Sequence, residues 1–224
     1  MKIIRHLETA FSNLLIIIVL QLRLCILRIS VTMSTKITLS VPYGKYDSYH
    51  NKWHPAWMGD LDLSSATEYM TTNETIITEI VDTVESQTQS REELANAFLD
   101  FVQDKGHGLS IRCYPSTEYK YPIETLVEMG GDCDAHAFLF ASLMKAAGFK
   151  VLLLFFDEII EYQHHVAIAV QLENPPTNSL ENIEDFHVSY NDEEYYFAET
   201  TCSNWRIGDL PPTLKDIPYK IFPL

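Results

Sequence analysis

The stretch GGDCDAHAFLFASLMKAAGF, residues 130–149, carries the strongest structural signal in this chain. Two glycines and an acid come before Cys133, and a long apolar run follows it. Asp132 is a residue type that caps helix N-termini, and Gly148 is the type that follows helix C-termini. The pattern predicts a helix over about 133–147. Because this helix is apolar on nearly every face, we expect it to lie buried at the centre of a domain.

A thiol at the start of a helix is exposed to the positive end of the helix dipole, which favours the nucleophilic thiolate. The flanking Asp132 and Asp134 oppose this effect, so the dipole alone does not activate Cys133. A histidine close to the thiol would complete a nucleophilic Cys–His pair. The sequence must therefore supply a histidine from another element.

The segment QHHVAIAVQ reads as a strand with two candidate histidines at its start. Side chains alternate between the two faces of a strand, so His165 shares a face with Ala167 and Ala169. His164 falls on the opposite face. Because small side chains leave room for a packed helix, we predict that His165 lies against Cys133 and that His164 lies near solvent.

A catalytic histidine needs a carboxylate that orients its ring. The next predicted strand, EYYFAETT (194–201), provides Glu199 near its end. A cysteine at a helix start, a histidine in a strand and an acid at a strand end are each ordinary features. Their order along the chain, Cys133, His165 and Glu199, is the order that a papain-type triad requires.

The remaining periodicity predicts helices before the central one and strands after it, which is typical of the α+β class. A first segment, 35–46, alternates as a strand or an extended lead-in. The predicted helices are 74–86, 90–104 and a short one opened by Pro122, and the predicted later strands are 150–156, 165–172 and 194–201.

Three blocks of this sequence resemble the transglutaminase-like superfamily of papain-fold cysteine enzymes, especially its archaeal and bacterial members. The blocks are YPIETLVEMGGDCDAHAFLFASLMKAAGFKVLLL, HHVAIAV and YYFAETTCSNWRIGDLP, and the resemblance spans residues 90–212. It implies a central helix that carries the cysteine and packs on an antiparallel sheet, as in the papain-like, transglutaminase-core fold. The implied catalytic residues are Cys133, His165 and Glu199. Many relatives carry Cys-Glu-Asp after the glycines and Asp as the third catalytic residue, and this chain differs at both places.

The resemblance implies acyl transfer through a thioester, with Cys133 as nucleophile. We expect hydrolysis of peptide or carboxamide bonds in a protein or peptide substrate, without a cofactor or metal. Transfer to an amine, which would crosslink proteins, is one alternative, and a non-catalytic binding module on the same fold is another. The Cys133 backbone N–H is a natural oxyanion donor, whereas Tyr121 is only a weak candidate for the side-chain donor.

A competing interpretation is a metal site built from cysteine and histidine side chains. It would use Cys133, His136, His164 and His165. The resemblance explains Cys133 and His165 without a metal, and no second paired motif supports this alternative.

The 224 residues carry a formal net charge of −15 at pH 7. Such a surface repels phosphate backbones, so nucleic acid is not an expected partner. Outside the first 32 residues, the chain has Cys113, Cys133 and Cys202, too few for a disulfide scaffold. A Cys113–Cys202 bridge is left open for the case that the domain is exported.

The segment FSNLLIIIVLQLRLCILRISV, residues 11–31, is apolar but contains Arg23 and Arg28. We interpret it as an imperfect single-pass membrane anchor. Translation that starts at Met33, giving a cytoplasmic protein, and a cleaved signal remain as alternatives. The expected organisation is a hydrophobic leader over 1–32, an N-terminal extension with a helix over 33–89 and a catalytic domain over 90–224.

Overall fold

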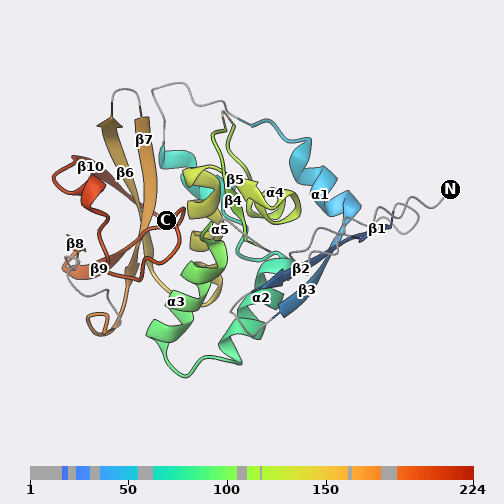
Figure 1. Cartoon of the computed structure of the whole chain (residues 1–224), viewed down its shortest axis with the longest axis horizontal. Coiled ribbons are helices and arrows are strands. Elements are labelled where there is room, and N and C mark those ends of the chain that lie inside the picture. The colour runs from blue at the N-terminus through green and yellow to red at the C-terminus, as the bar shows by residue number, and fades with distance from the viewer. Residues whose placement is uncertain are drawn as a thin grey trace.

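The computed structural model combines five α-helices with an antiparallel five-stranded sheet among the residues that it describes (Figure 1). The predicted α+β class is confirmed at this level. The described residues are 17–19, 24–30, 36–54, 63–104, 110–116, 118–160, 163–177 and 186–224.

The central helix is α5 (Cys133–Ala146), which begins at the predicted residue. Asp132 occupies the N-cap position, but its side chain makes no capping hydrogen bond, in contrast to the expectation. Gly148 adopts a positive φ of 77°, as expected just after a helix. In Figure 1, α5 lies between the main sheet and α4 (Pro122–Glu128), and α5 also contacts α2 (Thr75–Glu85) and α3 (Arg91–Val102).

The main sheet has the strand order β10-β6-β7-β9-β8, and all neighbouring strands run antiparallel. All three predicted later strands are present. One of them ends earlier than predicted, because residues 199–201 leave the strand after Ala198. The strands are β6 (Val151–Ile160), β7 (Gln163–Gln171), β8 (His187–Tyr190), β9 (Glu193–Ala198) and β10 (Tyr219–Pro223).

The sheet separates two hydrophobic cores. Val166, Ile168 and Val170 of β7 belong to the main core, which also contains the apolar residues of α5. Ala167 and Ala169, on the other face of β7, belong to a second core with residues of β6, β8 and β9 and of the C-terminal segment. A central strand that is covered on both faces holds its position firmly, and β7 is the strand that carries His165.

A smaller sheet is formed by β1 (Ile17–Val19), β2 (Leu24–Ser30) and β3 (Lys36–Pro42), in that order. Seven residue pairs join β2 to β3, so the predicted boundary at residue 32 separates two strands that the structure pairs. The lead-in expected over 35–46 is a strand only as far as Pro42, where α1 (Tyr43–His50) begins. Within the described residues, no helix combines the length and apolar character needed to cross a bilayer.

Short elements complete the architecture. A two-residue parallel pair joins β4 (Arg112–Cys113) to β5 (Gly130–Gly131), directly before α5. Two 3₁₀ helices cover Leu63–Tyr69 and Pro212–Leu214. The β4–β5 pair joins Gly130 and Gly131, just before Cys133, to Arg112 and Cys113. This pairing fixes the position of the first residues of α5.

Candidate functional site

The structure brings the three predicted site residues together. The Nε2 atom of His165 lies 2.8 Å from Oε2 of Glu199. Cys133 and His165 are close enough for each side chain to shift the pKa of the other. Because Glu199 occupies Nε2, the other ring nitrogen of His165, Nδ1, is the one available to the thiol. The thiol, imidazole and carboxylate groups therefore lie next to one another in that order.

Three elements position these side chains. Cys133 is the first residue of α5, and His165 lies near the start of β7. The antiparallel β7–β9 register pairs Ile168 with Ala198, so the chain that continues from β9 runs alongside the start of β7. Glu199, one residue past the end of β9, therefore lies next to His165.

His165 was expected on the face of β7 that packs against α5, and this expectation is wrong. His165 shares a face with Ala167 and Ala169, as alternation predicts, but that face covers the second core instead of α5. His164 lies on the other face and stacks on Phe155, with ring centroids 5.4 Å apart. His165 can still approach Cys133, because Cys133 is the first residue of α5 and His165 lies near the first residue of β7.

Glu199 is held by groups that sequence reasoning missed. Its Oε1 accepts hydrogen bonds from the Thr201 backbone N–H (2.9 Å) and from the Thr201 hydroxyl. The buried amide of Gln103 donates to the backbone carbonyl oxygens of Glu199 (2.9 Å) and Trp205 (3.1 Å). A threonine two residues after the acid was a usable local signal. Nothing in the sequence linked Gln103 to Glu199.

Two further acids, Asp185 and Asp192, lie between His165 and Glu199 in the sequence. Asp192 lies in the exposed turn between β8 and β9, with a positive φ of 63°. Asp185 lies outside the described residues. Of the candidate acids that the structure describes, Glu199 is the one that contacts His165.

The site has a distinctive charge balance. Burial by itself lowers the pKa of His165, but Glu199 and Cys133 outweigh burial and raise it to about 10. Burial by itself raises the pKa of Glu199, but His165 and Thr201 outweigh burial and lower this pKa below its usual range. Burial raises the pKa of the Cys133 thiol, and His165 only partly offsets that effect. At neutral pH the imidazole is therefore protonated and paired with the carboxylate.

Two acids flank the thiol and interact with each other. Asp134 is buried and Asp132 is half-buried, and each has a buried Oδ1 atom without a hydrogen-bond partner among the described residues. Burial, followed by the hydrogen bond and the charge of Asp132, raises the pKa of Asp134 well above its usual value. The neutral form of the Asp134 carboxyl is therefore favoured.

Asp134→Asn should raise the free energy of unfolding near neutral pH. Because the native pKa of Asp134 is raised, its contribution is most favourable below the unfolded value of about 3.9 and is lost as pH rises through the native value. Asparagine is neutral at every pH and removes this loss. We expect a gain above the ~0.5 kcal/mol of typical surface changes. The check is urea unfolding from pH 4 to 9. Asp82→Asn, on the exposed face of α2, serves as control. Parallel stability curves for wild type and Asp134→Asn would contradict the expectation.

Tyr119 is the tyrosine whose hydroxyl lies near the thiol. This hydroxyl is buried and has no hydrogen-bond partner among the described residues. Burial and the nearby Asp134, Asp132 and Cys133 raise its pKa, so it stays protonated and able to donate. The weak sequence candidate, Tyr121, instead packs among aromatic rings, with its centroid 4.9 Å from that of Tyr49.

The alternative cysteine–histidine metal site does not form. His136 is fully buried, and its Nδ1 atom lies 2.7 Å from the Val102 carbonyl oxygen and 3.2 Å from that of Thr200. Its Nε2 atom faces the carbonyl oxygen of Arg112. Burial lowers the pKa of His136, so the ring is a neutral support for three backbone segments.

The two remaining cysteines of the body are exposed free thiols, so the bridge left open between Cys113 and Cys202 is not formed. Burial of the sulfur, followed by the proximity of Cys202, raises the pKa of Cys113 to about 12. The thiolate form of Cys113 is therefore disfavoured.

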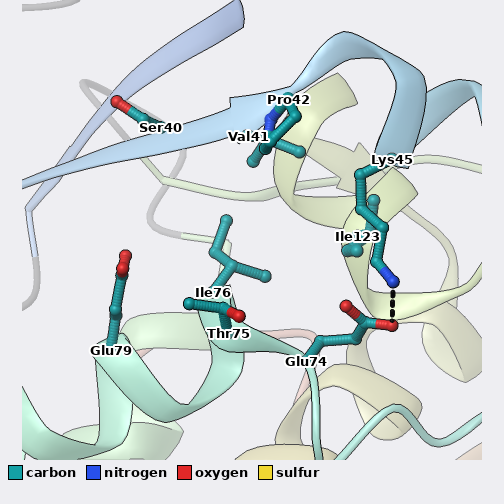
Figure 2. A pocket seen from close by; sticks show the side chains of 9 residues that line it. All are labelled: Ser40, Val41, Pro42, Lys45, Glu74, Thr75, Ile76, Glu79 and Ile123. Atoms are coloured by element: carbon teal, nitrogen blue, oxygen red, sulfur yellow. Dashed lines mark ion pairs between the residues drawn. The ribbon is translucent and has the colours of Figure 1, made fainter.

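A cavity of about 300 Å³ lies away from the triad, between β3 and α2 (Figure 2). An ion pair between Lys45 and Glu74, 2.7 Å apart, closes one side of it. No triad residue lines this cavity, so it is not where a bond presented to Cys133 would bind. The lining residues are Ser40, Val41, Pro42, Lys45, Glu74, Thr75, Ile76, Glu79 and Ile123.

Comparison with known proteins found no matching family model, no matching curated protein and no matching solved structure. The arguments about function therefore rest on the residues and on the geometry of the site.

Proposed function

We propose that this chain is a thiol-dependent acyl-transfer enzyme with a papain-like, transglutaminase-type core. The observation that carries the proposal is the hydrogen bond between His165 and Glu199, with Cys133 close enough to His165 for the two side chains to influence each other's pKa. The cysteine lies at a helix start, and the other two residues come from adjacent antiparallel strands or their ends. The three sequence blocks that resemble transglutaminase-like enzymes give independent support to the same residues.

In the proposed reaction, the Cys133 sulfur attacks a peptide or carboxamide carbonyl carbon. The protonated His165 stabilises the thiolate and then gives its proton to the leaving amine, which produces a thioester and a neutral imidazole. Water attacks the thioester, its proton passes to His165, and the carboxylic acid leaves as Cys133 sulfur is released. Glu199 keeps the imidazole oriented throughout.

The negative oxygen that forms in each step needs hydrogen-bond donors. The Cys133 backbone N–H is at the first position of α5, where the helix offers it no acceptor. The Tyr119 hydroxyl, buried and without a partner among the described residues, is the proposed second donor. This assignment replaces Tyr121.

We propose water as the acyl acceptor, since an amine acceptor would require a site shielded from water. A labelled primary amine distinguishes the two reactions, because a crosslinking enzyme attaches it to the substrate. A non-catalytic binding module is the remaining alternative. The hydrogen bond between His165 and Glu199 favours catalysis, because binding alone does not need Glu199 to orient His165.

Cys133→Ser should abolish turnover and covalent labelling at this position. The assay incubates the full chain with a mixed peptide library, with and without the labelled amine, and identifies products by mass spectrometry. An iodoacetamide probe reports on the thiol in parallel. The exposed Cys202 supplies the control Cys202→Ser, which should retain turnover. Equal turnover by wild type and Cys133→Ser would exclude Cys133 as the nucleophile. No turnover by either protein would favour the binding module.

A further inference from the structure

A second cluster of ionisable side chains lies where α1 meets α4, apart from the triad. His50 is the last residue of α1, and His54 follows four residues later. Glu124 and Glu128 lie one turn apart on the same side of α4. Figure 1 shows these two helices side by side. Two imidazoles and two carboxylates therefore converge from two elements.

The distances between the ligand atoms are those of a small coordination sphere. His50 Nδ1 lies 3.2 Å from Glu124 Oε1 and 3.6 Å from Glu128 Oε1, and His54 Nε2 lies 3.5 Å from the same oxygen of Glu124. Ligand atoms of His50, Glu124 and Glu128 all lie within 4.8 Å of one another. His54 lies outside this group of three and adjoins it at Glu124. Zinc–ligand bonds of about 2.0–2.1 Å place tetrahedral ligands roughly 3.3 Å apart. The three ion-pair distances are close to this value.

His54 is a further potential ligand at this cluster. Its Nδ1 atom lies 2.6 Å from the Tyr119 carbonyl oxygen, which can only accept a hydrogen bond, so Nδ1 carries a proton. The other ring nitrogen, Nε2, is buried, has no hydrogen-bond partner among the described residues and faces a carboxylate oxygen. A backbone carbonyl that fixes the histidine tautomer is the usual outer-shell arrangement of a metal site.

We propose that His50, His54, Glu124 and Glu128 bind a divalent transition-metal ion such as Zn²⁺. Two imidazole nitrogens and two carboxylate oxygens form a ligand set that Zn²⁺ accepts. The ion compensates the negative charge of Glu124, whose side chain is only 3% exposed. It would also lie beside Nε2 of His54, which faces the same carboxylate.

Neighbouring groups are compatible with this ion. The Tyr46 hydroxyl, which lies 2.8 Å from Glu128 Oε1 and 3.3 Å from His50 Nδ1, would become an outer-shell partner. Lys120 donates a hydrogen bond to the other carboxylate oxygen of Glu128, Oε2, and so does not occupy Oε1. The same ammonium group donates to the Gly130 carbonyl oxygen (3.0 Å), shortly before Cys133. A bound ion would thus brace α1 against the segment that leads into α5.

The test is metal binding by the full chain after removal of metal with a chelator. Wild type should bind one equivalent of Zn²⁺ in a calorimetric titration and should melt at a higher temperature when loaded. Co²⁺ should give visible absorption bands of four-coordinate geometry without thiolate charge-transfer absorption, which excludes cysteine ligands. His50→Ala and Glu128→Gln should each weaken binding at least tenfold, since outer-shell partners alone contribute about 10–100-fold.

The matched control is His187→Ala. His187 is a half-exposed histidine that lies 4.0 Å from Glu194, so it resembles His50 without the other ligands. Its loss should leave Zn²⁺ affinity unchanged. The proposal is overturned if wild type binds no Zn²⁺ at 100 micromolar (about a hundred times a micromolar Kd). It is equally overturned if His50→Ala and Glu128→Gln bind as tightly as wild type.

Discussion

Glu199→Gln should lower turnover by about 10²–10⁴-fold, by analogy with orienting acids in other triads. Glutamine has a similar size but no charge. Glu199 is the main group that raises the pKa of His165 to about 10, so this pKa should fall in the variant. His165 would then lose its proton at a lower pH than in the wild type. Because the imidazolium stabilises the thiolate, Cys133 should become nucleophilic only at higher pH.

The measurement is the pH profile of Cys133 alkylation, together with turnover normalised to the folded fraction. Glu199→Asp should be milder than Glu199→Gln, because it retains the charge on a shorter side chain. Asp192→Asn is the matched control, since Asp192 lies in an exposed turn and asparagine tolerates its positive φ. Coinciding alkylation profiles for wild type and Glu199→Gln would show that Glu199 does not orient His165.

Gly131→Ala should both destabilise the protein and displace Cys133. A Cβ atom at Gly131 would lie 2.3 Å from the Cβ of Ala135, which is fully buried in the first turn of α5. Neither atom can rotate away, so the start of α5 must shift. We expect a loss of about 1–3 kcal/mol in the free energy of unfolding. Turnover should fall by about 10²-fold, because displacement of a catalytic group by about 1 Å has that effect.

The control for this variant is Gly44→Ala in α1, where an added Cβ meets nothing within 4 Å. That change should be neutral or slightly stabilising, because alanine favours helices. The double variant Gly131→Ala/Ala135→Gly removes the clashing carbon and should restore turnover, although glycine in a helix costs about 1 kcal/mol. A single variant Gly131→Ala with wild-type stability and turnover would refute the steric argument. The close contact with Ala135 explains why position 131, two residues before Cys133, is a glycine.

The fold class and the identities of the triad residues were predictable from local patterns. The apolar run after Cys133 predicts α5, because a helix that is apolar all round must be buried. The alternating segment around His165 predicts β7, because period-two patterns specify strands. Glu199 was found from its place at the end of the next strand and from the resemblance to a known family.

Features that depend on contacts between distant segments were not predictable. Alternation assigns His165 and His164 to opposite faces of β7, but only the packed sheet determines which face covers α5. Gln103 and Tyr119 carry no local signal, because their roles depend on partners far away in the chain. The pairing of β2 with β3 was hidden by an apolar composition that fits a membrane anchor equally well.

The order of the elements and the chemical groups that the chain can offer follow from residue type and spacing. The protonation of those groups depends on how the folded chain packs around them. The pKa of His165 is raised because folding buries it beside Glu199, and that of Asp134 because folding buries it beside Asp132. Folding also brought His50 and His54 to Glu124 and Glu128, about seventy residues away. Burial and proximity set these energies, and both exist only after the chain has folded.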